Sequence, residues 1–209
     1  MHALRLFLIR TLTLMTVAVG VNATAQEIPR TDKDPHQAHQ APQKQEVSPA
    51  QQYFTDVALI NQNGQQMRLY SDLLKGKIVV INAFFTSCKD TCPIMAHSLA
   101  VLQEWLGDRL GKDVYLISIS VDPETDTPAK LLEYAARFNA RPGWFFLTGK
   151  KENVNQALNK LGQYVAVRED HLNVMIMGNE ATGLWKKAMG LAKPEDLIKI
   201  LDSLLKDKG

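Results

Sequence analysis

The sequence predicts an α/β fold in which a mixed central β-sheet carries helices on both faces. Two short apolar runs rich in β-branched residues, Ile78–Phe85 and Val114–Val121, are typical of buried strands. Segments with apolar residues at helical spacing follow both runs, and a strand–helix–strand succession implies parallel pairing with a right-handed connection. Two hairpin patterns add antiparallel strands, so the expected sheet is mixed.

The first hairpin opens the globular part of the chain. Val57–Ile60 and Met67–Tyr70 flank Asn61–Gly64, whose glycine suits a turn with positive φ. The second hairpin joins Val174–Met177 to Leu184–Met189. A further short strand, Trp144–Leu147, follows a glycine.

Helices are expected between and after these strands. Proline at the first helical turn, where its missing N–H is not needed, marks the start of three of them. The expected segments are a turn at Ser71–Leu74 and helices at Pro93–Leu106, Pro128–Asn139, Glu152–Leu161 and Pro194–Leu205.

An acidic loop, Asp122–Pro128, precedes one of these helices. Its carboxylates, Asp122, Glu124 and Asp126, are of the kind that bind cations. The favoured interpretation is an acidic loop that ends in Thr127 as N-cap and a proline as first helical residue.

Three segments of different composition divide the chain. Residues 1–25 have a basic start, an apolar stretch and an Ala23–Ala25 cleavage pattern, which predicts a secretory signal peptide. Residues 26–52 hold almost no large apolar residue and predict a disordered linker, in which His36 and His39 are interpreted as part of a solvated tether. Residues 53–209 form the predicted domain.

Charge excludes one class of function. The chain has 24 basic and 22 acidic residues, and the signal peptide holds two of the arginines and no acid. The remaining chain is therefore neutral and has no basic footprint for nucleic acid. Export to the periplasm is expected, with an uncleaved inner-membrane anchor facing the periplasm as the alternative, and we expect a monomer.

Cys88 and Cys92, the only cysteines, lie where a strand ends and a helix begins. Free N–H groups at a helix start favour a thiolate, so these thiols are expected to ionise more readily than a free thiol. Two such thiols can close a disulfide or bind a soft metal ion. A purely structural disulfide is the alternative.

A metal held by two thiolates needs a further ligand, and the residues alone leave three candidates. Met95 shares the helix face of the cysteines, but a methionine at this place is more often part of the core. His97 is rotated about 140° from Cys92 around a helix of about 100° per residue. His171 precedes the strand Val174–Met177, and Asp170 is a candidate to orient its imidazole.

Three segments together resemble the Sco/SenC family of copper proteins. They read FFTSCKDTCP from Phe84, SVDPETDTP from Ser120, and DH at Asp170, in the family's order and spacing. The similarity covers nearly all of residues 53–205. The chain departs from the family in having Lys89 where a proline is usual and Leu172 where a serine is frequent.

The resemblance implies a thioredoxin-like fold and a copper ion bound by Cys88, Cys92 and His171. It also implies that the two cysteines are a redox pair that cycles between dithiol and disulfide. Family members assist assembly of the dinuclear copper site of cytochrome c oxidase, so the implied partner is a copper-receiving oxidase subunit or another cuproprotein.

Two other functions remain open at the level of sequence. A thiol–disulfide oxidoreductase would use the same two cysteines without obligatory metal. A peroxidase of thioredoxin fold fits less well, because it needs one activated cysteine and not a pair.

Overall fold

The structure, a computed structural model, describes residues 48–209. The predicted signal peptide, His36 and His39, and most of the predicted linker lie outside these residues. The described part opens with helix α1 (Pro49–Phe54), whose N-cap is Ser48 with its side chain accepting from the Gln51 N–H. Residues 49–52, assigned to the linker by composition, are therefore helical.

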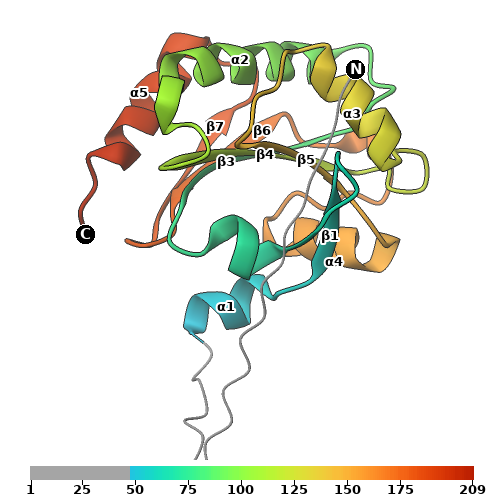
Figure 1. Cartoon of the computed structure of the whole chain (residues 1–209), viewed down its shortest axis with the longest axis horizontal. Coiled ribbons are helices and arrows are strands. Elements are labelled where there is room, and N and C mark those ends of the chain that lie inside the picture. The colour runs from blue at the N-terminus through green and yellow to red at the C-terminus, as the bar shows by residue number, and fades with distance from the viewer. Residues whose placement is uncertain (1–47) are drawn as a thin grey trace, which may run out of the picture. The chain divides into compact units, whose positions relative to one another are not determined.

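A seven-stranded mixed sheet forms the centre of the domain, in the order β2-β1-β5-β4-β3-β6-β7 (Figure 1). The strands are β1 (Ala58–Asn61), β2 (Gln66–Arg68), β3 (Ile78–Phe84), β4 (Val114–Ser120), β5 (Trp144–Thr148), β6 (Val174–Asn179) and β7 (Leu184–Met189). The β3, β4 and β5 strands are parallel, while both hairpins and the β3–β6 pair are antiparallel.

Helices cover both faces of the sheet, as predicted. In Figure 1, α2, α3 and α5 lie on one side of the sheet, and α1 and α4 lie on the other. Their bounds are α2 (Thr91–Leu106), α3 (Pro128–Ala136), α4 (Lys151–Lys160) and α5 (Pro194–Leu205). Short turns of π-helix (Leu69–Leu74) and 3-10 helix (Gly107–Arg109 and Arg168–Asp170) connect the elements.

Each face of the sheet has its own apolar core. Leu99, Leu102 and Leu201 belong to the core beneath α2, α3 and α5, and all three are fully buried. Leu73 and Leu158 belong to the core on the opposite face. None of the helices within residues 48–209 combines the length and apolar character that crossing a bilayer requires.

The predicted elements are confirmed, with shifts at their ends. The strand predicted to reach Tyr70 stops at Arg68, because Asp56 accepts hydrogen bonds from the Tyr70 and Ser71 N–H groups and starts a π-helix there. The helix that follows Thr127 ends at Ala136, short of Asn139, which has a φ of 49°. Thr127 is its N-cap, as predicted.

Candidate metal centre

The loop between β3 and α2 holds both cysteines. Helix α2 starts at Thr91, two residues before the proline that was expected to open it. Cys92 therefore lies within the first turn, whereas Cys88 lies in the loop and donates its N–H to the Phe85 carbonyl at 3.2 Å. Both are free thiols, 9% and 1% exposed at Cys88 and Cys92 respectively.

Sheet topology brings His171 to these thiols. Strand β6 runs antiparallel to β3, with Met175 opposite Asn82, so the residues just before β6 lie beside the end of β3. His171 comes 79 residues after Cys92 in the chain, yet its Nε2 is 3.2 Å from the Cys92 Sγ. The ligand atoms of Cys88, Cys92 and His171 all lie within 4.8 Å of one another.

The imidazole of His171 is oriented by a backbone carbonyl. Its Nδ1 lies 3.1 Å from the carbonyl oxygen of Arg168, an atom that only accepts hydrogen bonds, so Nδ1 carries the proton. The lone pair of the neutral ring is then on Nε2, which faces the thiol of Cys92. Asp170, which the sequence left open as either an orienting group or a solvated residue, is exposed.

Burial disfavours the charged forms of His171 and Cys92 in the metal-free site. It lowers the pKa of His171, which favours the uncharged imidazole. Burial, and then a hydrogen bond that the Cys92 thiol donates to Cys88, raise the pKa of the Cys92 thiol well above its usual range. The expectation that the helix start makes this thiol ionise more readily is therefore wrong for the metal-free protein, because desolvation outweighs the helix.

The other two ligand candidates have different surroundings. Met95 is fully buried in the core, and the end of its side chain packs against Gly190. His97 is exposed on α2. Among residues 48–209, Cys88, Cys92 and His171 are the set that brings three metal-binding side chains together.

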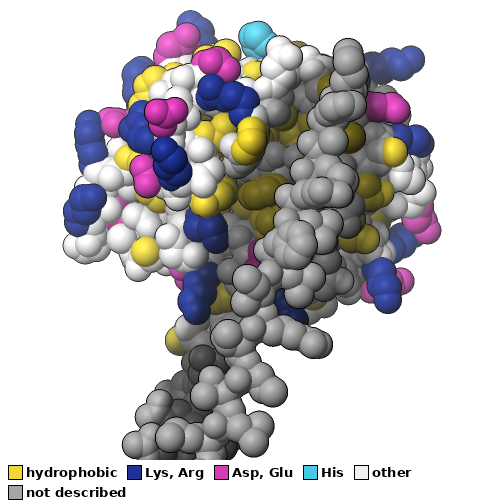
Figure 2. Space-filling model, viewed as in Figure 1, with side chains coloured by type: hydrophobic (Ala, Val, Ile, Leu, Met, Phe, Trp, Pro, Cys, Tyr) yellow, Lys and Arg dark blue, Asp and Glu magenta, His cyan; other side chains and the backbone are white. Residues whose placement is uncertain are grey.

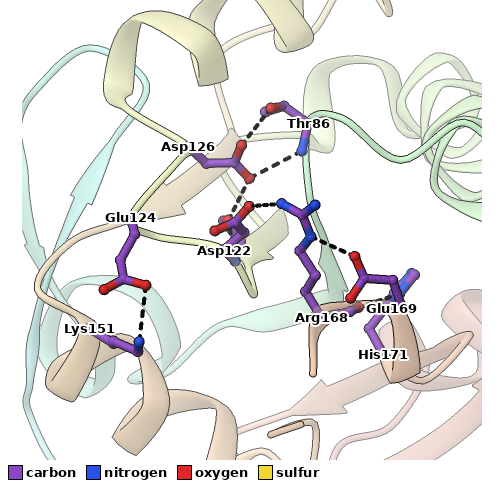
Figure 3. Close-up of polar contacts among 9 residues, drawn as sticks. Thr86, Asp122, Glu124, Asp126, Lys151, Arg168, Glu169 and His171 are labelled. Atoms are coloured by element: carbon purple, nitrogen blue, oxygen red, sulfur yellow. Dashed lines mark hydrogen bonds and ion pairs between the residues drawn. The ribbon is translucent and has the colours of Figure 1, made fainter. Parts of the chain in front are cut away.

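Asp126 is a buried anchor that the sequence did not reveal. It is fully buried, although the sequence indicated only an acidic loop that leads into a helix. Its carboxylate accepts from the Thr86 N–H at 3.1 Å, the Thr86 hydroxyl at 2.5 Å and the Ser120 hydroxyl at 2.6 Å (Figure 3). This carboxylate thus holds the start of the cysteine loop. The alternation of acidic residues with threonines was the one available signal, and it fits a solvated loop equally well.

Aromatic side chains surround the ligands. The ring of Phe85 meets the imidazole of His171 edge to face at 5.4 Å. Tyr134 is a buried residue of α3, and its hydroxyl has no partner in the described structure. Burial, and then the negative charge of Cys92 when ionised, raise the pKa of this phenol, so it keeps its proton.

The donor set fits a soft transition-metal ion. Two sulfur atoms and one imidazole nitrogen suit copper or zinc, whereas calcium and magnesium prefer oxygen. The three donors converge without a carboxylate, and the imidazole already has the tautomer that a metal ligand needs. The fold and this site define a thioredoxin-like protein with a candidate dithiol–imidazole site for a metal.

The chain belongs to the SCO1/SenC family, whose model matches residues 45–206. A SCO2-like protein of Rickettsia conorii is 34% identical over 111 residues, which are 53% of this chain and 52% of that protein. The chain thus spans about half the length of that relative.

Solved structures share the fold. The structure of Bradyrhizobium japonicum ScoI with copper bound has a TM-score of 0.59 and 26% identity, over 71% of this chain and 97% of that chain. BsSco, described as having a disulfide switch and as a member of the Sco family of cytochrome c oxidase assembly proteins, has a TM-score of 0.60 and 29% identity, over 73% of this chain and 93% of that chain.

Proposed function

We propose that this protein is an exported copper metallochaperone that assists assembly of the dinuclear copper site of cytochrome c oxidase. Copper is the cargo, and Cys88, Cys92 and His171 hold it. The observation that carries this proposal is the convergence of two sulfurs and one imidazole nitrogen within 4.8 Å. Soft sulfur donors are the ligands that Cu(I) prefers.

The site is arranged for binding that can be reversed. Both thiols lose their protons when they bind a cation, and the energy for this comes from the metal–sulfur bonds. His171 supplies Nε2 without having to lose a proton, because it is already neutral. Cys88 and His171 keep 9% exposure each and Cys92 only 1%, so we expect a partner's ligands to approach from the side of Cys88 and His171.

Relatives support copper as the cargo and the oxidase as the destination. Copper is bound in the Bradyrhizobium structure, and BsSco is described as one of the cytochrome c oxidase assembly proteins. The present chain shares their fold and family, and carries the cysteine pair and the histidine in one site.

The N-terminal pattern supports export. A basic start, an apolar stretch and Ala23–Ala25 direct the chain to the periplasm, an oxidising compartment in which a dithiol is liable to oxidation. Export also places the domain on the side of the membrane where it can reach a copper site that faces the periplasm. An uncleaved segment would instead leave the domain attached to the inner membrane.

A thiol–disulfide oxidoreductase is the second candidate function. The observation that favours it is that both cysteines are free thiols with their sulfur atoms within 4.8 Å. In that reaction Cys88 and Cys92 give up two electrons and two protons and become a disulfide. The partner's disulfide accepts them and becomes two thiols.

Copper stoichiometry separates the two functions. The reduced protein is mixed with Cu(I), passed through a desalting column and analysed for metal and thiols. One copper retained per chain is expected, and none after Cys88→Ser or Cys92→Ser, because a hydroxyl does not replace a thiolate for a soft ion. Thiol exchange with a disulfide substrate, without any copper retention, would favour the oxidoreductase.

A further inference from the structure

We propose that Arg168 is a positioning residue for the third metal ligand: its side chain ties the His171 loop to the acidic loop after β4. The inference rests on the proposed function for its meaning, since His171 has to be a ligand. The contacts that carry it are independent of any metal.

The backbone carbonyl of Arg168 fixes the orientation of the His171 imidazole. The backbone N–H of His171 donates to the Arg168 oxygen at 3.2 Å, and the ring Nδ1 lies 3.1 Å from the same oxygen. Ring orientation therefore follows the orientation of this one peptide group. Whatever holds Arg168 in place also holds Nε2 toward Cys92.

The side chain of Arg168 is held by two carboxylates. One terminal guanidinium nitrogen, Nη1, donates to the carboxylate of Asp122, and Nε donates to Glu169 at 2.7 Å. Figure 3 shows the guanidinium lying between these two acidic groups, with His171 on the neighbouring part of the loop. Arginine offers donors in a planar fork, which lysine does not.

The Asp122 end of this ion pair is anchored firmly. The Asp122 side chain is only 12% exposed, and its N–H donates to the Ser120 hydroxyl at 3.0 Å. Four residues later, Asp126 holds Thr86 at the start of the cysteine loop. The loop from Asp122 to Asp126 thus joins the segment that carries the cysteines to the segment that carries the histidine.

A second contact of the guanidinium reaches the same site. It lies over the ring of Phe85, 5.3 Å from the ring centroid, and that ring also contacts the His171 imidazole edge to face. A cation over an aromatic face is attracted to it, more so when partly shielded from water. Arg168 therefore constrains both the backbone next to His171 and the Phe85 ring that contacts the imidazole.

A neighbouring ion pair provides a matched control. Lys151 binds Glu124 at 3.0 Å on the same acidic loop, and both side chains are more than half exposed. Figure 3 shows this pair on the side of the loop away from His171. Its loss removes one surface ion pair without touching the His171 segment, and such exposed pairs contribute little.

The test compares Arg168→Gln, Arg168→Lys and Lys151→Met in the full chain. All three retain the carbonyl at position 168, so an effect of the first two acts through the side chain. In the reduced, metal-free protein, ¹⁵N shifts of the His171 ring report its tautomer. The wild type and Lys151→Met are expected to show the Nδ1–H form, Arg168→Gln a mixture of both tautomers, and Arg168→Lys an intermediate mixture.

Copper competition with a chromophoric chelator gives the second readout. Arg168→Gln is expected to weaken copper binding about tenfold, as is typical for loss of a group that orients a ligand, while Lys151→Met stays at the wild-type value. If Arg168→Gln does not fold, Arg168→Lys carries the comparison. An unmixed Nδ1–H tautomer with wild-type copper affinity in both Arg168 variants would overturn the inference. A wild type that binds no copper would instead refute the proposed function, and the tautomer comparison would still decide the role of Arg168.

Discussion

The imidazole of His171 is held at both of its nitrogens. Nδ1 is bound to the Arg168 carbonyl and Nε2 faces the Cys92 thiol, so the ring needs little rearrangement when a metal replaces the thiol proton. His97 has the same chemistry but lies exposed on α2. The two side chains are chemically identical and differ only in their location, so substitutions at the two positions can be compared directly.

Replacing each histidine by alanine should separate their roles. We expect His171→Ala to weaken copper binding by more than about 100-fold, beyond the range typical of outer-sphere changes, while Cys88 and Cys92 still form a disulfide. His97→Ala should do neither. The measurement is a copper titration of both variants with thiol counts before and after oxidation. Copper loss in His97→Ala with retention in His171→Ala would mean that the third ligand is misassigned.

At the scale of elements, Asp56 explains why β2 is short. Its carboxylate accepts from the N–H groups of Tyr70 and Ser71 and from the Ser71 hydroxyl at 2.6 Å. Burial acts to raise the pKa of Asp56, but these hydrogen bonds and the charge of Arg68 outweigh it and lower the pKa overall. The carboxylate therefore stabilises the start of the π-helix most when it is ionised.

Asp56→Asn should lower the free energy of unfolding by about 1 kcal/mol at pH 7, the usual size of a lost helix cap. Because the pKa is lower in the folded state, this stabilisation is present above the unfolded pKa of about 3.9 and is lost as the pH falls through the folded value. Urea unfolding of both proteins at pH 7 and near pH 2 measures it. A constant difference across this range would contradict the role of the charge, and Asp108→Asn serves as an exposed control.

The β6–β7 hairpin depends on a glycine that is needed for space and not for a positive φ. Gly178 is paired across the strands with Trp185, and a Cβ at Gly178 would lie 2.1 Å from the indole ring. Gly178→Ala should therefore cost about 1–3 kcal/mol through overpacking. Thermal unfolding measures the change. In a Trp185→Ala background the same substitution should cost much less, and an equal cost in both backgrounds would refute this explanation.

At the scale of the whole molecule, charge is mixed over the surface. On the face drawn in Figure 2, the described basic and acidic side chains are interspersed and separated by apolar and neutral groups. This distribution agrees with the nearly equal numbers of basic and acidic residues. The described side chains that are visible on that face therefore form no large patch of one charge sign.

The sequence predicted the sheet, the helices and their order, because strand runs, proline starts and glycine turns are local signals. It placed Cys88 and Cys92 together, since they are close in the chain. His171 remained one of three candidates until the resemblance was considered, because its approach depends on β3–β6 pairing. The burial of Asp126 and the raised pKa of Cys92 depend on packing, which no local pattern encodes.

Export is predicted from the first 25 residues, which lie outside the described structure. We expect cleavage after Ala25 and a mature chain that begins at Gln26 in the periplasmic fraction. Mass spectrometry of that fraction identifies the terminus. An intact N-terminus found only in the membrane fraction would favour the anchored form.

The most direct test of the metal centre is X-ray absorption spectroscopy of the copper-loaded, reduced protein beside His171→Ala. We expect one copper per chain with two sulfur neighbours at about 2.3 Å, as for other metal–thiolate bonds, and one imidazole nitrogen at about 2.0 Å. The imidazole contribution should disappear in His171→Ala. A copper shell in the wild type that lacks the imidazole, or that contains fewer than two sulfurs, would contradict the assignment of Cys88, Cys92 and His171 as the ligands.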